Sequence, residues 1–173
     1  MNLGQKILEK LCAMRRTESL PKADQDNGYV IEEEIDSMRV RAEIQDFDKF
    51  SCIVKTLSVT RRQAPPANVS LKELLLRQGG EIERRITYLL ENFRLLEVDE
   101  FNCLAQVRSA APHQKSGEKF YYEVFLQHGI GATFSRYRQS RRRAENRELV
   151  PCQLTQETFE RLIDDLVATL RLG

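Results

Sequence analysis

The residues from Met38 to Gln45 alternate strictly between apolar and polar side chains. The apolar positions are Met38, Val40, Ala42 and Ile44, and the polar positions are Arg39, Arg41, Glu43 and Gln45. Successive side chains of a β-strand point to opposite faces of the sheet, so this pattern predicts a strand with one buried face and one face in water. Antiparallel sheets commonly have this half-solvated arrangement, whereas parallel sheets are covered on both faces.

Further strand-like segments lie in two groups, one on each side of a central helical region. The first group comprises residues 29–35, 38–45 and 50–60, and the second comprises residues 103–108, 120–126, 130–138 and a short segment near 149–153. Strands that cluster, instead of alternating with helices, are typical of α+β proteins. We therefore expect an α+β fold with an antiparallel sheet of about six to seven strands in two groups.

Helical patterns occur at both ends of the chain and in its centre. Apolar side chains recur at helical spacing within residues 2–15 and within residues 155–172. In the centre, the capping-box sequence from Ser70 to Glu73 predicts a helix start. Gly79-Gly80 predicts that this short helix ends and that a second one runs from about Glu81 to Leu95. We expect the N-terminal helix, the two central helices and the C-terminal helix to pack on the sheet.

The chain divides into a short N-terminal arm and one larger unit. Residues 17–28 are polar and rich in turn-forming residues, which predicts a loop. We therefore assign residues 1–27 to an N-terminal amphipathic helix and polar loop, and residues 28–173 to a single α+β domain. We expect the N-terminal helix to dock either on this domain or on a second subunit, so a homodimer is one expected assembly.

Composition indicates a folded protein and argues against a membrane location. Hydrophobic residues make up 41% of the chain and charged residues 31%, and no apolar stretch is long enough to span a membrane. The charged N-terminus lacks the apolar centre of a secretory signal. The four cysteines are spaced by 40 to 51 residues, so no pair has zinc-ligand spacing. We expect a cytoplasmic protein with reduced, largely buried thiols.

The strongest functional signal is the arginine-rich segment from Arg136 to Arg147. Its arginines are Arg136, Arg138, Arg141, Arg142, Arg143 and Arg147. With one glutamate among them the segment carries a local charge of +5, whereas the whole chain carries +1. The planar guanidinium suits phosphate or carboxylate, so these residues predict an anion- or partner-binding surface. The alternative is that the acidic C-terminal helix neutralises them, through Glu157, Glu160, Asp164 and Asp165.

No catalytic or cofactor motif stands out elsewhere in the sequence. It contains no nucleophile elbow, phosphate loop, dinucleotide fingerprint or zinc-protease motif. The acidic run from Glu32 to Glu34 is predicted to be a solvated strand edge, or else to face the arginine-rich segment. His113 and His128 have no evident partner. We therefore expect no metal, no cofactor and no enzymatic activity, although catalytic groups need only meet in space.

Three functions are compatible with these features. The leading interpretation is a non-catalytic macromolecular binding or adaptor protein, acting through its sheet and its arginine-rich segment on a protein partner or on a second copy of itself. The first alternative is a nucleic-acid-binding module that uses Arg136–Arg147, with Phe134 and Tyr137 stacking on bases. The second is a small-molecule-binding or enzymatic cavity between the sheet and the C-terminal helix, lined by residues such as Phe120, Tyr122, Phe134 and Phe159.

Overall fold

The computed structural model describes residues 2–17, 28–110, 113–115, 117–140 and 147–172. Within these ranges the helices are α1 (Leu3–Thr17), α2 (Leu71–Arg85) and α3 (Gln156–Leu170). The strands are β1 (Tyr29–Ile35), β2 (Met38–Phe47), β3 (Ser51–Arg61), β4 (Phe93–Asp99), β5 (Leu104–Ser109), β6 (His113–Lys115), β7 (Glu118–Gln127), β8 (Gly131–Ser140), β9 (Arg147–Leu149) and β10 (Cys152–Thr155). None of the described helices is long and apolar enough to cross a membrane.

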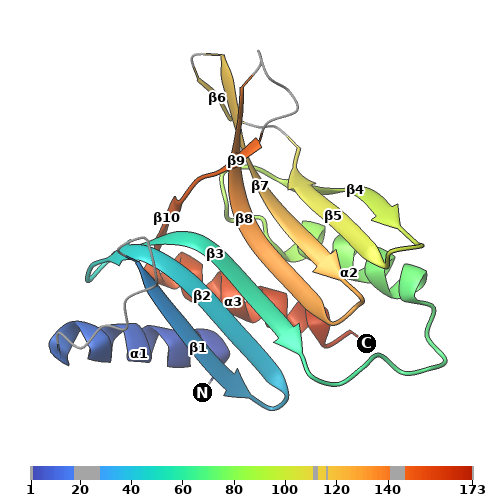
Figure 1. Cartoon of the computed structure of the whole chain (residues 1–173), viewed down its shortest axis with the longest axis horizontal. Helices are drawn as coiled ribbons and strands as arrows, with labels where there is room; N and C mark the ends of the chain where they lie inside the picture. The colour runs from blue at the N-terminus through green and yellow to red at the C-terminus, as the bar shows by residue number, and fades with distance from the viewer. Residues whose placement is uncertain (1, 18–27, 111–112, 116, 141–146, 173) are drawn as a thin grey trace.

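All of these strands belong to one antiparallel sheet. Its main path runs β1-β2-β3-β8-β7-β5-β4, while β10 pairs with β3, β6 with β7 and β9 with β8 (Figure 1). The pairing of β3 with β8, in which Leu57 lies opposite Phe134, joins the two predicted groups of strands into one sheet. The predicted α+β class and antiparallel sheet are confirmed, and the main path has the predicted number of strands.

The three helices lie on the same face of this sheet (Figure 1). α1 contacts β1, α2 contacts β4 and β5, and α3 contacts β3 and β8. The hydrophobic core fills the space between helices and sheet, where Phe134 of β8 and Phe159 of α3 are both 0% exposed. Burying a side chain of this size stabilises the fold by about 1.5–3 kcal/mol. No described helix covers the opposite face, which we call the open face.

Strand β2 shows how the sequence produces these two different faces. Val40 and Ala42 are fully buried on the helix side, whereas Arg39 and Arg41 are exposed on the open face. Both arginines bond to Glu32 of the neighbouring strand β1, Arg41 at 2.8 Å. The predicted alternation of apolar and polar side chains is therefore confirmed, and the polar side is covered by cross-strand ion pairs.

The centre of the chain contains one helix where the sequence predicted two. α2 begins at the predicted capping box, where the Ser70 hydroxyl accepts a hydrogen bond from the backbone amide of Glu73 at 3.4 Å. The helix then continues through Gly79-Gly80. A Cβ on Gly79 would come within 2.9 Å of a methyl carbon of Leu95 in β4. The glycine thus permits close packing of helix on strand and does not end the helix, and residues 86–92 lead directly into β4.

Helix α1 docks on the chain's own sheet and on α3. Ile7 and Leu11 belong to the hydrophobic core. On the polar side, Lys6 and Lys10 pair with Glu33 of β1 at 2.9 and 2.7 Å. Hydrogen bonds from Lys10 and Lys6 lower the pKa of the Glu33 carboxyl. Apolar burial and ion pairs together fix this helix against β1, one of the two arrangements that the sequence allowed.

Two tight hairpin turns use backbone conformations with positive φ. Asp36 (φ 50°) and Ser37 (φ 68°) join β1 to β2, and His128 (φ 52°) and Gly129 (φ 69°) are the first two of the three residues that join β7 to β8. Positive φ at both central residues suits a two-residue turn between right-handedly twisted strands. Glycine adopts this conformation freely, whereas a residue with a Cβ, such as Ser37, is disfavoured there by roughly 1–2 kcal/mol.

Replacing Ser37 by glycine is expected to raise the free energy of unfolding by about 0.5–1 kcal/mol, because it relieves this backbone strain. The Ser37 carbonyl would still accept the backbone amide of Arg62, at 2.8 Å. Urea unfolding followed by circular dichroism measures the change. The matched control is Ser58→Gly inside strand β3, which we expect to lower the stability by a similar amount. A loss of stability in Ser37→Gly would contradict the strain assigned to this turn.

Candidate binding site on the open face

Glu123 is a buried carboxylate on the open face of the sheet. Its side chain, near the middle of β7, is 3% exposed. It lies opposite Arg108 of β5 on one side and Ser135 of β8 on the other. Removing a carboxylate from water is costly unless charged or polar groups replace the lost hydration. Gln106, Arg108 and Arg147 make that replacement.

These three side chains donate hydrogen bonds to the Glu123 carboxylate from both sides. The amide of Gln106 donates at 2.6 Å and Nη2 of Arg108 at 3.1 Å, both from β5. Nη1 of Arg147, from β9, lies 3.0 and 2.9 Å from the two carboxylate oxygens. Burial alone would lower the pKa of Arg147, but the nearby carboxylate gives a net rise. The Glu123 carboxylate therefore accepts hydrogen bonds from three side chains and holds those side chains in place.

Two tyrosines lie beside this carboxylate and support the arginines. Tyr121 and Tyr137 are cross-strand partners, with ring centroids 5.8 Å apart and planes inclined by 29°. The guanidinium of Arg108 lies 4.3 Å from the centre of the Tyr121 ring, and that of Arg147 lies 4.3 Å from the Tyr137 ring. Cation–π contacts therefore add to the ion pairs with Glu123, so each arginine is held at two points.

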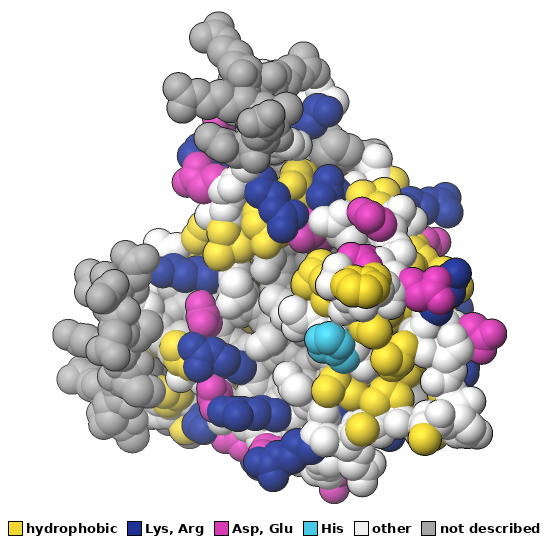
Figure 2. Space-filling view, turned by 45° about the vertical axis from the view of Figure 1, so that its right-hand side comes forward, with side chains coloured by type: hydrophobic (Ala, Val, Ile, Leu, Met, Phe, Trp, Pro, Cys, Tyr) yellow, Lys and Arg dark blue, Asp and Glu magenta, His cyan; other side chains and the backbone are white. Residues whose placement is uncertain are grey.

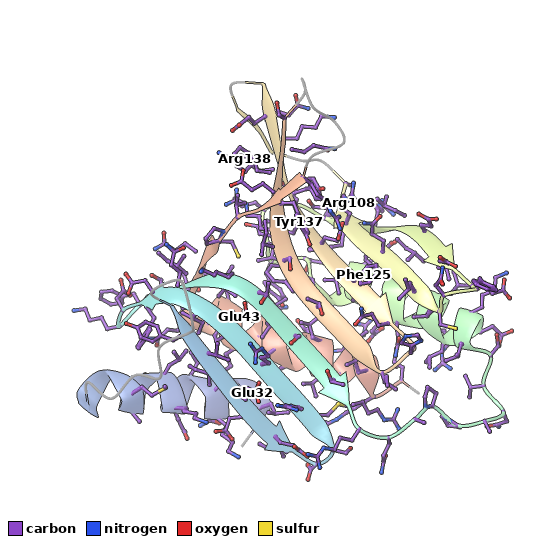
Figure 3. All side chains as sticks on the ribbon, in the orientation of Figure 1. Glu32, Glu43, Arg108, Phe125, Tyr137 and Arg138 are labelled. Carbon is purple, nitrogen blue, oxygen red and sulfur yellow. The ribbon has the colours of Figure 1, made fainter. Side chains whose placement is uncertain are left out.

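Two pockets flank Phe125, which is labelled with Arg108 and Tyr137 in Figure 3. The first, which we call the β8 pocket, has a volume of about 200 Å³ and is lined by Glu123, Phe125, Gln127, Thr133, Ser135, Tyr137 and Arg147. The second, the β4 pocket, has about 180 Å³ and is lined by Glu97, Asp99, Leu104, Ala105, Gln106 and Phe125. Both are smaller than the roughly 300–1,000 Å³ of most small-molecule sites, so each fits a side chain or a single ring.

Part of the surface on this side of the molecule is apolar. Figure 2 shows lysine and arginine side chains interspersed with acidic ones over the left and lower parts, and hydrophobic side chains gathered on the right. Two large apolar side chains are strongly exposed, Leu96 of β4 at 54% and Phe101 between β4 and β5 at 95%. This side of the molecule therefore offers apolar contact area to a ligand.

The structure separates the predicted arginine site into parts with different environments. Arg147 belongs to the Glu123 network, and Arg138 pairs with Glu148 at 2.5 Å and Glu118 at 3.9 Å. Arg136 lies on the opposite face of the sheet from Tyr137. The remaining predicted residues, Arg141, Arg142 and Arg143, lie outside the described part of the chain.

Arg136 is packed against aromatic rings on the helix side of the sheet. Its guanidinium lies 5.3 Å from the centre of the Phe120 ring and 5.5 Å from that of Tyr122. Its Nε is buried without a hydrogen-bond partner among the described residues. Tyr122 in turn stacks on Phe134 at 5.6 Å between ring centroids, and both rings belong to the hydrophobic core.

The alternative interpretation of the arginine-rich segment was that the acidic C-terminal helix neutralises it. The carboxylates that pair with Arg138 and Arg147 do not come from that helix. They come from β7 and β9, because these strands pair with β8 along its arginine-bearing half. Two acidic side chains of α3 have other partners. Asp165 accepts from Tyr88 at 3.0 Å and pairs with Arg85, and Asp164 accepts from the backbone amide of Gly4 at 3.1 Å. The acidic run in β1 also pairs elsewhere, with Arg39, Arg41, Lys6, Lys10 and Arg62.

Sequence reasoning missed the residues at the centre of this site, namely Glu123, Phe125 and Arg108. A signal for Glu123 was present, because it is the one charged residue in the otherwise apolar and aromatic run from Phe120 to Leu126. The alternation that buries one half of this run places Glu123 and Phe125 together on the other face. What the run does not reveal is which residues of β5 and β9 lie beside it.

The chemistry of this surface has to be inferred from its own geometry, because comparison with protein-family models, curated proteins and solved structures finds no match. Among the described residues, no three metal-binding side chains gather at one place. Burial raises the pKa of the Cys52 and Cys152 thiols to about 12 each, so both stay protonated and unreactive near neutral pH. The open face combines fixed charges, aromatic rings and small pockets, which suits binding.

Replacing Glu123 by glutamine is expected to lower the free energy of unfolding by about 2–3 kcal/mol, because two arginines lose the carboxylate that compensates them. The matched control is Glu148→Gln, which removes the carboxylate of an exposed pair with Arg138. That change is expected to cost less than about 1 kcal/mol. Chemical unfolding of both variants measures the difference, and equal losses would show that Glu123 does not organise the site.

Proposed function

We propose that the protein is a non-catalytic binding module that takes up an extended segment of a partner protein on the open face, across Phe125. The observation that carries this proposal is the pair of side-chain-sized pockets on either side of one aromatic ring. A pocket of this size holds one group of a larger ligand, and neighbouring pockets hold successive groups. A macromolecule gains the rest of its contact area from the surrounding surface.

The spacing of the pockets suits an extended peptide. The β4 pocket lies over β4 and β5, and the β8 pocket lies over β7 and β8. Neighbouring strands are about 4.8 Å apart, so the pocket centres are separated by roughly 10 Å. An extended chain in the polyproline II conformation rises about 3.1 Å per residue and has three residues per turn, so residues i and i+3 lie roughly 9 Å apart on the same side. One segment crossing the strands can therefore place two of its side chains in the two pockets.

Phe125 is suited to act as the anchor of this interface. Its ring is half-buried and forms a wall of both pockets. Among the residues that the structure describes, no other ring or cation stacks on it. Aromatic side chains in partly enclosed sites carry a large share of binding energy at protein interfaces. Exposed Leu96 and Phe101 are close in the chain to Glu97 and Asp99 of the β4 pocket and add apolar area.

The charges of the described residues favour a protein partner over a nucleic acid. Arg108, Arg138 and Arg147 are each paired with a carboxylate of the same chain. A phosphate would have to compete with those carboxylates for the guanidinium groups. Nucleic-acid-binding surfaces are usually strongly basic, whereas this chain carries a net charge of only +1.

Selection of a random dodecapeptide library on the immobilised protein tests the proposal. We expect enriched sequences that bind in the micromolar range and that lose at least about tenfold in affinity for Phe125→Ala, because that change removes the shared wall of both pockets. The matched control is Leu90→Ala, a residue that is 98% exposed and lines neither pocket. This control is expected to bind the peptides as the unchanged protein does.

Two results would contradict this function. One is the absence of enriched peptides, and the other is peptides that bind Phe125→Ala and the unchanged protein equally. Thermal unfolding of Phe125→Ala checks that the fold is retained. A labelled oligothymidylate, titrated at low and high salt, serves as the competing probe. Micromolar binding that salt abolishes would favour the nucleic-acid alternative instead.

A further inference from the structure

The floor of the β8 pocket is made of uncharged polar groups. Thr133 and Ser135 of β8 contribute hydroxyls, and Gln127 of β7 contributes an amide. Within the described part of the chain, no side-chain hydrogen bond occupies these three residues. Each group can both donate and accept, so together they offer hydrogen bonds in both senses to a ligand. An aromatic wall, Phe125, stands beside them.

The charged groups of the same pocket are already paired with each other. Its lining contains one carboxylate, Glu123, and one guanidinium, Arg147, joined at 2.9 Å. The carboxylate also accepts from Gln106 and Arg108, so little acceptor capacity is left for a cation. An anion would have to share Arg147 with Glu123. Bringing a charged group into this pocket therefore costs hydration without providing a free counter-charge.

We propose that the β8 pocket binds an uncharged, planar amide group, with its flat face on Phe125 and its N–H and C=O bonded to the hydroxyls and the amide of the floor. An amide needs one acceptor and one donor in a fixed arrangement, which Thr133 and Ser135 can supply because alternate residues of β8 lie on the same face. In the binding module proposed above, this group is an asparagine or glutamine side chain of the partner segment. That last step rests on the proposed function, whereas the preference for an uncharged amide rests on the pocket itself.

Three ring compounds of nearly equal shape test the chemical preference. Benzamide is neutral, benzoate is an anion and benzamidine is a cation, and each is small enough for a pocket of about 200 Å³. Titrations followed through the backbone amide signals of Phe125, Thr133 and Ser135 in nuclear magnetic resonance spectra give the affinities. We expect a dissociation constant of roughly 1–10 mM for benzamide, and at least about tenfold weaker binding of both charged compounds.

Removing one hydroxyl locates the site. Thr133→Val keeps the shape of the side chain and is expected to weaken benzamide binding by about three- to tenfold, the effect of one lost hydrogen bond. The matched control is Thr60→Val, on β3 opposite Gly131 and outside the pocket, which we expect to leave binding unchanged. The inference would be overturned if benzoate or benzamidine bound as tightly as benzamide. It would also be overturned if Thr133→Val left the affinity for benzamide unchanged, or if benzamide did not bind at all.

The outcomes also separate this inference from the proposed function. Peptides whose binding depends on Phe125, together with failure of benzamide, would keep the binding module but assign another group to the pocket. Benzamide binding without any enriched peptide would keep the amide site and remove the protein partner. Uridine, whose uracil ring carries the planar amide groups found in nucleic acid, is a further test compound. Uridine binding at least tenfold tighter than benzamide would overturn the assignment to a protein side chain.

Discussion

The carboxyl group of Glu123 lies on the water-facing side of the sheet and yet is almost completely enclosed. Such burial is unfavourable unless neighbouring groups replace the lost water, and Gln106, Arg108 and Arg147 do so at hydrogen-bonding distance. Moving either arginine away would leave the carboxylate uncompensated. The network therefore ties β5, β7 and β9 together and fixes one end of the β8 pocket.

The availability of this surface follows from how the helices are distributed. Because α1, α2 and α3 all bury their apolar faces on one side of the sheet, the other side depends on its own side chains to be stable in water. Over β1 and β2 it uses ion pairs that satisfy one another. Over β5, β7 and β8 it instead uses a buried carboxylate, cation–π contacts and a half-buried phenylalanine. This second arrangement leaves polar groups and an aromatic ring for a ligand.

Local sequence patterns predicted those helices and strands that are determined by neighbouring residues in the chain. Strict alternation predicted β2, the capping box at Ser70 predicted the start of α2, and helical spacing predicted α3, where Thr155 accepts the backbone amide of Thr158. The prediction of a second central helix was wrong. Gly79 lies inside α2, where it allows Leu95 of β4 to pack closely against the helix, and this tertiary contact is not visible in the local sequence. The centre of the site depends on register between strands distant in sequence, which no local pattern encodes.

The same distinction applies to the arginine-rich segment. Its charge density was evident in the sequence, but its partners were not, because a guanidinium pairs with whichever carboxylate the sheet brings beside it. Arg147 reaches Glu123 across β8, and Arg138 reaches Glu148 on the paired strand β9. Arg108 lies outside the segment and was not singled out, yet it shares the same carboxylate. The proposed binding surface is thus defined by strand neighbours and not by the run of arginines.

The most direct test of this account is the rigidity of the arginine side chains, measured by nitrogen-15 relaxation of their Nε–Hε bonds. If Glu123 holds Arg108 and Arg147 on the open face, their order parameters should be near 0.8, roughly the value of rigid backbone. Arg94, whose side chain is 68% exposed, should fall below about 0.6 in the same experiment. Order parameters for Arg108 and Arg147 as low as that of Arg94 would contradict the central claim that Glu123 preorganises this face.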